Sequence, residues 1–234
     1  TDTLFVDSTN NRVGVGQLSP VVQMHIKGSS SANNAELRLE EVNGDVAQLI
    51  SLGDEFRIGT TAANPMTFRT SNAERLRILS GGGLTFNGDT AAANALSDYE
   101  EGSFTPTFGG STGNQTVTYS SQVGKYVKVG KLVFVNISVI ASGTPVGGAG
   151  DLLVKGLPFT GISGVQQAGS IAFANNISFG SSGTQGYCNI EGGASQLQIN
   201  SQELSGTSSM ARVPANGIAN ANPRIVCTIC YETA

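Results

Sequence analysis

Two runs decide the fold of this chain, SDYEEGSFTPTF at residues 97–108 and GKYVKVGKLVFV at residues 124–135. Before this junction the apolar segments are short and interrupted, whereas after it they are longer and apolar enough to build a core of their own. Alternation of apolar and polar residues is typical of a half-buried β-strand. The junction, Ser97 to Val139, therefore predicts the change from a thin stalk to a globular head.

The composition limits the classes of protein to which the chain can belong. Of its 234 residues only 13% are charged, against 39% hydrophobic, and 31 are glycine. About a quarter of the residues in a typical domain are charged. With half that share here, Ser, Thr, Asn and Gln must supply most of the polar groups of the surface. The formal net charge of −4 does not favour a nucleic-acid groove, and no run approaches the roughly eighteen apolar residues of a membrane-spanning helix. We therefore predict no nucleic-acid partner and no membrane insertion.

The three cysteines form no recognisable site. Cys227 and Cys230 have C-x-x-C spacing, but they lie in a predicted strand, where residues three apart point to opposite faces. A zinc site would need a second pair of ligands, which the sequence lacks. We predict that both thiols are buried and reduced, and we expect neither a metal nor another cofactor.

Short apolar–polar–apolar triplets recur in the first ninety residues. They are Leu37–Leu39, Phe56–Ile58, Met66–Phe68, Leu76–Ile78 and Leu84–Phe86. A buried side chain contributes roughly 1.5–3 kcal/mol, whereas ordering each residue costs about 1–2 kcal/mol, so one copy of such short strands should be unstable alone. We predict that three identical chains surround an axis, with Arg38, Arg57 and Arg77 facing water. Residues 1–96 would then form a homotrimeric β-rich stalk, with a neck linker near 90–97.

Residues 98–234 predict a globular β-domain. Its strand-like segments are 116–119, 124–129, 132–140, 151–154, 170–173, 186–190, 196–199 and 224–231. Many short strands between Gly, Ser, Asn and Pro clusters, without a helical pattern, are typical of a β-sandwich or jelly roll. The expected fold class is all-β: a homotrimeric β-rich stalk of short strands followed by a β-sandwich or jelly-roll-like head.

Several of these segments resemble parts of tailed-bacteriophage tail fibres. The runs at 4–20 and 74–86 are similar to fibre shaft motifs, and 124–126 with 130–133 looks like the start of a fibre-tip domain. The resemblance implies a virion protein whose head is the receptor-binding tip. Its implied partners are upstream tail-fibre or baseplate components and a bacterial surface glycan or outer-membrane protein. Because the chain lacks an initial Met, we expect it to be part of a longer polypeptide.

Polar loops of the head are the candidate receptor-binding surface. Five residues combine amide groups with an aromatic ring: Asn175, Asn176, Gln185, Tyr187 and Asn189. Sugar hydroxyls need directional hydrogen bonds, and the apolar face of a sugar ring packs on an aromatic side chain. We predict that these residues bind the receptor, while the same residue types also occur in loops that only connect strands.

Histidine chemistry is restricted by the single histidine, His25, which lies in the stalk. A Ser-His-Asp or Cys-His centre in the head is therefore excluded within one chain. A metal site at His25 would need three copies of the chain to meet on an axis.

Two carboxylates placed close together could still form the catalytic site of a glycosidase. The neighbours Glu40/Glu41 and Glu100/Glu101 point to opposite faces of a strand, which is the wrong geometry for flanking one glycosidic bond. A spatial pair among the isolated head carboxylates stays open; these are Asp151, Glu191 and Glu203. We predict a non-enzymatic attachment protein. The alternatives are a tailspike-like polysaccharide depolymerase and a purely structural virion fibre.

Overall fold

The structure is a computed structural model that describes residues 4–28, 34–179, 184–203 and 210–233. The described chain is built of strands, with two short 3₁₀ turns, η1 (Ala92–Asn94) and η2 (Ala215–Ile218). The predicted all-β class is therefore confirmed. The chain divides into two compact units, Thr1–Ser97 and Asp98–Ala234.

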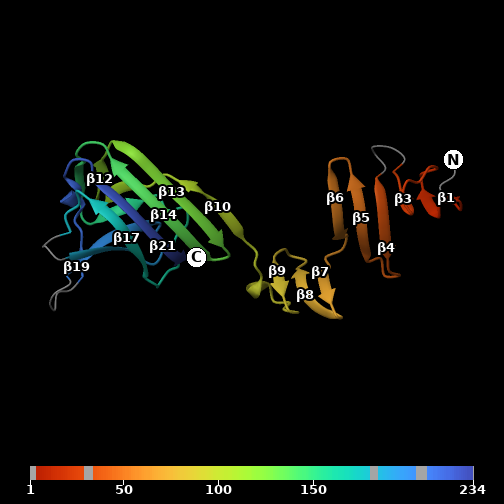
Figure 1. The fold of residues 1–234 in the computed structure, drawn as a ribbon. Coiled ribbons are helices and arrows are strands. Elements are labelled where there is room, and N and C mark those ends of the chain that lie inside the picture. The colour runs from red at the N-terminus through yellow and green to blue at the C-terminus, as the bar shows by residue number, and fades with distance from the viewer. Residues whose placement is uncertain (1–3, 29–33, 180–183, 204–209, 234) are drawn as a thin grey trace. The chain divides into compact units, whose positions relative to one another are not determined.

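The first unit contains three separate three-stranded sheets (Figure 1). Their strands are β1 (Leu4–Asp7), β2 (Arg12–Val15) and β3 (Met24–Ile26); β4 (Ala35–Glu40), β5 (Val46–Leu52) and β6 (Glu55–Thr60); and β7 (Met66–Thr70), β8 (Ala73–Ile78) and β9 (Leu84–Phe86). Strand β3 runs parallel to β2, and the other pairs are antiparallel. All five apolar–polar–apolar triplets lie in strands, as predicted.

These small sheets bury very little. Among the described residues of the first unit, Val46 and Ile50 are the only large apolar side chains that are buried. Six others in β4, β6, β7 and β9 are more than a third exposed: Leu37, Leu39, Phe56, Ile58, Phe68 and Phe86. A single copy of this unit therefore leaves most of its apolar strand positions in water.

The arginines of the triplets differ in their surroundings. The side chains of Arg38 and Arg57 are more than half exposed, as predicted. Arg77, which was also predicted to face water, is only 18% exposed. It is covered because its Nε and Nη2 atoms donate to the two carboxylate oxygens of Glu74 at 2.8 and 2.6 Å.

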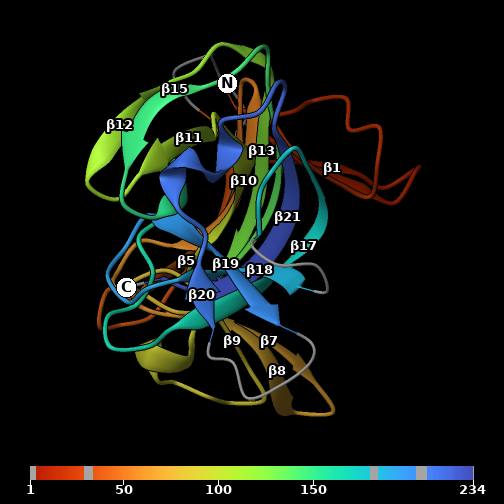
Figure 2. The same cartoon turned by 90° about the vertical axis from the view of Figure 1, so that its left-hand side faces the viewer.

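The second unit is built on one antiparallel sheet that curls over on itself (Figures 1 and 2). Its order is β10 (Tyr99–Phe104), β13 (Tyr119–Val129), β14 (Leu132–Ala141), β21 (Arg224–Glu232), β17 (Gln167–Asn175), β18 (Thr184–Ile190), β19 (Gln196–Glu203), β16 (Leu152–Lys155) and β11 (Thr107–Gly110). Strand β20 (Ala211–Arg212) pairs with β19, and β12 (Gly113–Thr116) pairs with β15 (Val146–Ala149). The two layers of the expected sandwich thus belong to one continuous sheet.

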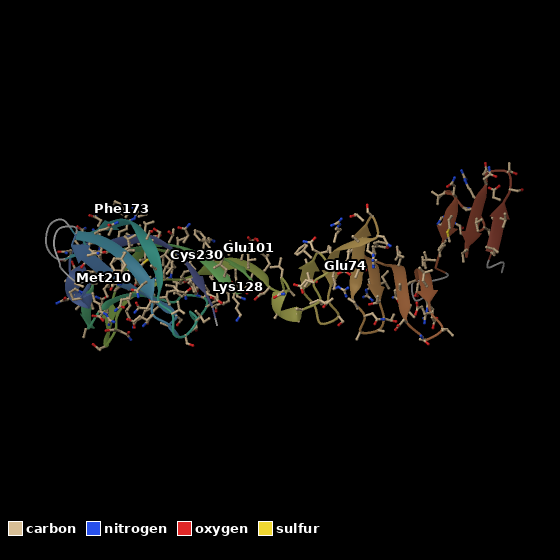
Figure 3. All side chains as sticks on the ribbon, turned by 90° about the horizontal axis from the view of Figure 1, so that it is seen from below. Glu74, Glu101, Lys128, Phe173, Met210 and Cys230 are labelled. Carbon is tan, nitrogen blue, oxygen red and sulfur yellow. The ribbon has the colours of Figure 1, made fainter. Side chains whose placement is uncertain are left out.

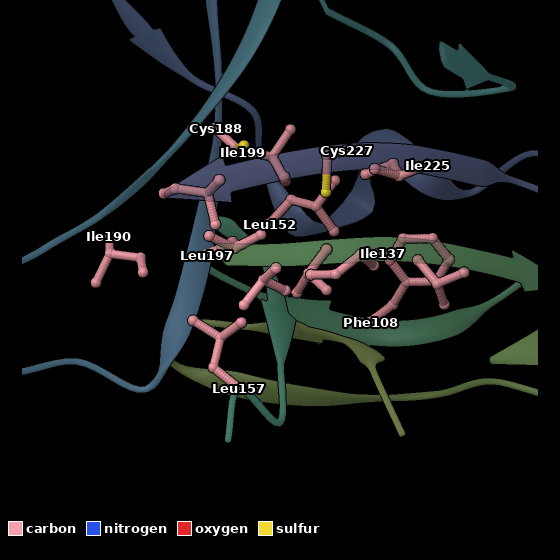
Figure 4. Close-up of a cluster of buried hydrophobic side chains, with 14 of the residues drawn as sticks. Phe108, Ile137, Leu152, Leu157, Cys188, Ile190, Leu197, Ile199, Ile225 and Cys227 are labelled. Atoms are coloured by element: carbon pink, nitrogen blue, oxygen red, sulfur yellow. The ribbon is translucent and has the colours of Figure 1, made fainter. Parts of the chain in front are cut away.

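The curl encloses a single core (Figure 4). It is formed by Val133, Val135, Ile137 and Val139 of β14; Ile225, Cys227, Ile229 and Tyr231 of β21; Leu152 and Val154 of β16; Cys188 and Ile190 of β18; and Leu197 and Ile199 of β19. Alternate residues of each long strand point inward, which is the period of two that predicted these strands. Since each such side chain is worth roughly 1.5–3 kcal/mol when buried, this core can hold one copy of the unit together.

Two glycines fix the register between β10 and β13 at the junction. Gly102 lies opposite Tyr126, and Gly124 lies opposite Phe104. A Cβ at Gly124 would stand 2.6 Å from the Phe104 ring, and one at Gly102 would stand 2.7 Å from the Tyr126 hydroxyl oxygen. Each ring therefore covers the glycine of the facing strand. A slip of one residue would bring side chains beneath both rings, so these pairs hold the strands in register.

The cysteines only partly follow the prediction. Cys188, Cys227 and Cys230 are all free thiols, and Cys227 and Cys230 lie on opposite faces of β21, as predicted. Cys230 is exposed, so the prediction that both residues are buried is wrong for it, because the outer face of β21 is uncovered. A hydrogen bond with Cys188, together with burial, raises the pKa of Cys227, which keeps that thiol protonated.

Candidate functional site

A polar groove lies on the outer face of the hairpin formed by β18 and β19. Tyr187 stands opposite Asn200, and Asn189 stands opposite Gln198. Because side chains alternate along a strand, Cys188 enters the core while these four polar residues line the groove. The hollow has a volume of about 340 Å³, within the usual range of ligand pockets.

The floor of this groove is a layer of amide side chains. Gln198 and Asn200 are buried at 6% and 5% exposure. Asn200 donates its amide N–H groups to Oδ1 of Asn189 and to the backbone oxygen of Gln198. Burial raises the pKa of Tyr187, so its hydroxyl keeps its proton and can either donate or accept a hydrogen bond. The hairpin therefore presents an aromatic ring beside fixed amide groups.

An ion cluster lies in the wall of the groove. Arg212 on β20 donates from Nη1 to Oδ2 of Asp151 at 2.7 Å and from Nη2 to Oε1 of Glu191 at 2.6 Å. Gln198 also donates from Nε2 to Asp151 at 3.2 Å. The bond to Asp151 and the negative charge of Glu191 raise the pKa of Arg212, which stays a cation. Two of the isolated head carboxylates thus converge, an arrangement that the sequence left open.

The predicted receptor-binding residues fall into two groups. Gln185, Tyr187 and Asn189 occupy alternate positions of β18 and share one face. Asn175 lies instead near the far end of β17, opposite Arg224. Its neighbour Asn176 donates from Nδ2 to the backbone oxygen of Ala221 at 2.6 Å, so this side chain holds a loop.

Several groove residues were missed from the sequence. The run QLQIN at residues 196–200 alternates polar and apolar positions, and this pattern could have indicated that Gln198 and Asn200 share a polar face. Arg212 carries no such local signal. It is brought to the groove by the pairing of β20 with β19, where it lies opposite Asn200.

The other candidate residues lie elsewhere. His25 is on β3, and its Nδ1 atom is buried without a partner among the described residues. No group of three or more His, Cys, Asp or Glu side chains gathers there or elsewhere in the described chain. Glu100 accepts a hydrogen bond from Tyr126, and Asp98 pairs with Lys128, so these two acidic residues at the start of the second unit contact side chains of β13. The side chain of Glu203 lies outside the described residues.

In the described residues, no helix is both long enough and apolar enough to cross a bilayer.

The chain was compared with family models, curated proteins and solved structures. No family model matches the chain, and no curated protein matches it. Among solved structures, the crystal structure of the Dettilon tailspike protein is similar over 58% of this chain, with 19% sequence identity and a TM-score of 0.47. The match covers 24% of that protein, so the chain spans about a quarter of its length.

One prediction is corrected by this comparison. The chain was expected not to be an enzyme, but the similar structure is that of a tailspike protein. The expectation of a non-enzyme is therefore withdrawn. An identity of 19% and a TM-score of 0.47 do not transfer an activity, so the chemistry of this chain has to be argued from its own residues.

Proposed function

We propose that this chain is the distal part of a phage tail fibre or tailspike, and that its second unit attaches the virion to a bacterial surface glycan. The groove on β18 and β19 is the observation that carries this proposal. It combines the Tyr187 ring with the amides of Asn189, Gln198 and Asn200 in one hollow. Rings and amides side by side suit a sugar, which has an apolar face and hydroxyls at its rim.

Binding of the purified protein to host cells tests this proposal. The protein should bind wild-type cells and fail to bind cells that lack surface polysaccharide. Tyr187→Ala should weaken binding at least tenfold, about 1.4 kcal/mol, because it removes the platform on which the sugar ring packs. The matched control is Tyr99→Ala, which removes an exposed tyrosine from β10. Equal binding to both kinds of cell, or equal loss in both variants, would contradict a glycan site in this groove.

We also infer that the chain acts as a homotrimer. In the first unit, the exposed apolar side chains of β4, β6, β7 and β9 support this inference, because sister copies would cover them. Three copies would also place three groove sites on one particle, and linked weak sites gain affinity through their effective concentration. Native mass spectrometry should find three chains; a stable folded monomer at micromolar concentration would refute the inference.

The outer face of the head sheet offers a second surface for such contacts. Val127 lies opposite Phe134, which in turn lies opposite Cys230, and Val129 lies opposite Leu132. All five side chains are exposed (Figure 3 labels Cys230). A contiguous apolar strip of this kind is typical of a surface that another protein covers.

Polysaccharide cleavage is a second candidate, favoured by the convergence of Asp151 and Glu191 on Arg212. Glycosidases use two carboxyl groups, of which one must give a proton to the leaving group. Arg212 donates to one oxygen of each carboxyl group, so the acid would have to carry that proton on its other oxygen. Reducing ends should then appear when the protein is incubated with host polysaccharide and be absent with Asp151→Asn or Glu191→Gln. No release by the unaltered protein would exclude this activity.

A further inference from the structure

The charged groups around the groove are few and already paired. Two adjoining hollows, of about 340 and 110 Å³, share Glu191, Gln198 and Arg212 in their walls. In the described residues that line them, the charged side chains are Asp151, Glu191 and Arg212. The remaining lining consists of amides, one serine, Tyr187 and apolar side chains. At neutral pH the two carboxylates and one guanidinium give this lining a net charge of −1.

Arg212, the one cation among the described lining residues, is already paired with two carboxylates. Both terminal nitrogens of Arg212 donate to protein carboxylates, at 2.7 and 2.6 Å. A carboxylate, phosphate or sulfate on a ligand that approached the remaining N–H groups of Arg212 would lie beside these two carboxylates. Asp151 and Glu191 would then repel it, because they carry the same sign of charge. Specificity arises in this way whenever a site holds an unfavourable charge against the wrong ligand.

The neutral part of the lining suits hydroxyl and acetamido groups. Gln167 donates from Nε2 to the backbone oxygen of Glu232 at 3.1 Å and accepts from its backbone N–H, so it braces the end of β21 against β17. Asn200 in turn braces Asn189. The amides beside Tyr187 are therefore held in place before a ligand arrives, which lowers the entropy lost on binding.

From this arrangement we infer that the groove selects uncharged glycan segments, built from neutral hexoses or N-acetylated hexosamines, and rejects segments that carry uronic acid, phosphate or sulfate. The inference rests on the proposed function, because it names the chemical class of ligand for the same groove. It goes beyond that function because a host surface commonly offers neutral and acidic saccharides together, and only the former would be bound.

The first test uses surface polysaccharide extracted from cells that the full chain binds. Binding is measured before and after the acidic groups are removed, by reduction of carboxyl groups and by hydrolysis of phosphate and sulfate esters. Affinity should not fall after this treatment, and it should change less than twofold when the salt concentration rises from 50 to 500 mM. If binding is lost with the acidic groups, the selectivity inference is overturned while glycan attachment stands. If the untreated polysaccharide does not bind, the proposed function fails instead.

A charge variant provides the second test. Glu191→Gln removes one carboxylate and leaves Nη2 of Arg212 without its ionic partner. With oligogalacturonate as the acidic probe, this variant should bind at least tenfold more tightly than the unaltered protein. Glu100→Gln, which makes the same change on β10 away from the groove, is the matched control and should not gain affinity. Tight binding of the acidic probe by the unaltered protein, or no gain in Glu191→Gln, would overturn the inference.

Discussion

The two units of this chain are built from similar strand sequences but bury them to very different extents. In the second unit, the curled sheet presses alternate residues of β14 and β21 against those of β16 and β19. In the first unit, each sheet has three strands, and Val46 and Ile50 are the only large apolar side chains buried among the described residues. The comparison teaches that apolar alternation predicts a strand, but not what will cover it.

The largest contrast should come from truncating one leucine in each unit. Leu197→Ala removes a side chain with 0% exposure and should lower the free energy of unfolding by about 2–5 kcal/mol. Leu39→Ala removes a side chain with 62% exposure and should cost less than about 0.5 kcal/mol in an isolated chain. Urea unfolding followed by circular dichroism measures both. Equal costs would show that the first unit has a core that a single copy does not display.

Replacing one glycine by alanine in each unit should change the free energy of unfolding differently. Gly124→Ala places a Cβ against the Phe104 ring and should destabilise the second unit by about 1–3 kcal/mol. Gly59→Ala on β6 meets no atom within 4 Å and should be neutral or stabilising by up to about 1 kcal/mol, because it restricts the unfolded chain. Thermal unfolding of the two variants decides this. A neutral Gly124→Ala would mean that Phe104 moves aside freely.

Dilution should lower the melting temperature of the first unit more than that of the second unit. If sister copies cover the strands of the first unit, each tenfold dilution weakens every association step by about 1.4 kcal/mol, and its melting temperature falls. The melting of the second unit should depend less on concentration, because its core lies within one chain. Differential scanning calorimetry over a hundredfold range of concentration provides the measurement. Two transitions that both ignore concentration would remove the argument for association.

The smallest effect should be the pH dependence of the first unit. Hydrogen bonds from Arg77 hold the pKa of Glu74 below its ordinary value of 4.5. A lowered carboxyl pKa stabilises the folded state above the unfolded pKa, and this stabilisation is lost as pH falls through the folded pKa. The unaltered protein should therefore be more stable than Glu74→Gln at pH 7, and the difference should begin to shrink near pH 4.5 and vanish only below the lowered pKa of Glu74. Glu41→Gln, in the turn after β4, is the control; a difference that grows in acid would contradict the assignment.

The sequence predicted most strands because their signal is local. The strand β14, with inward Val133, Val135 and Ile137, follows the period of two that any half-buried strand shows. Strand β5 escaped prediction, since the adjacent Leu49 and Ile50 break the alternation, and its pairing with β4 and β6 makes it a strand. The predicted strand at 116–119 was wrong, because β12 ends at Thr116 and β13 begins at Tyr119.

By itself the sequence determined the all-β class, the contrast between a poorly buried and a well buried region, and the polar face of β18. Only the tertiary structure decided the groove. Asp151, Glu191 and Arg212 are far apart in the chain, and no spacing rule connects them. They meet because β16, β18 and β20 are brought to β19 by strand pairing, and pairing between distant strands depends on the whole sheet rather than on any local run of residues.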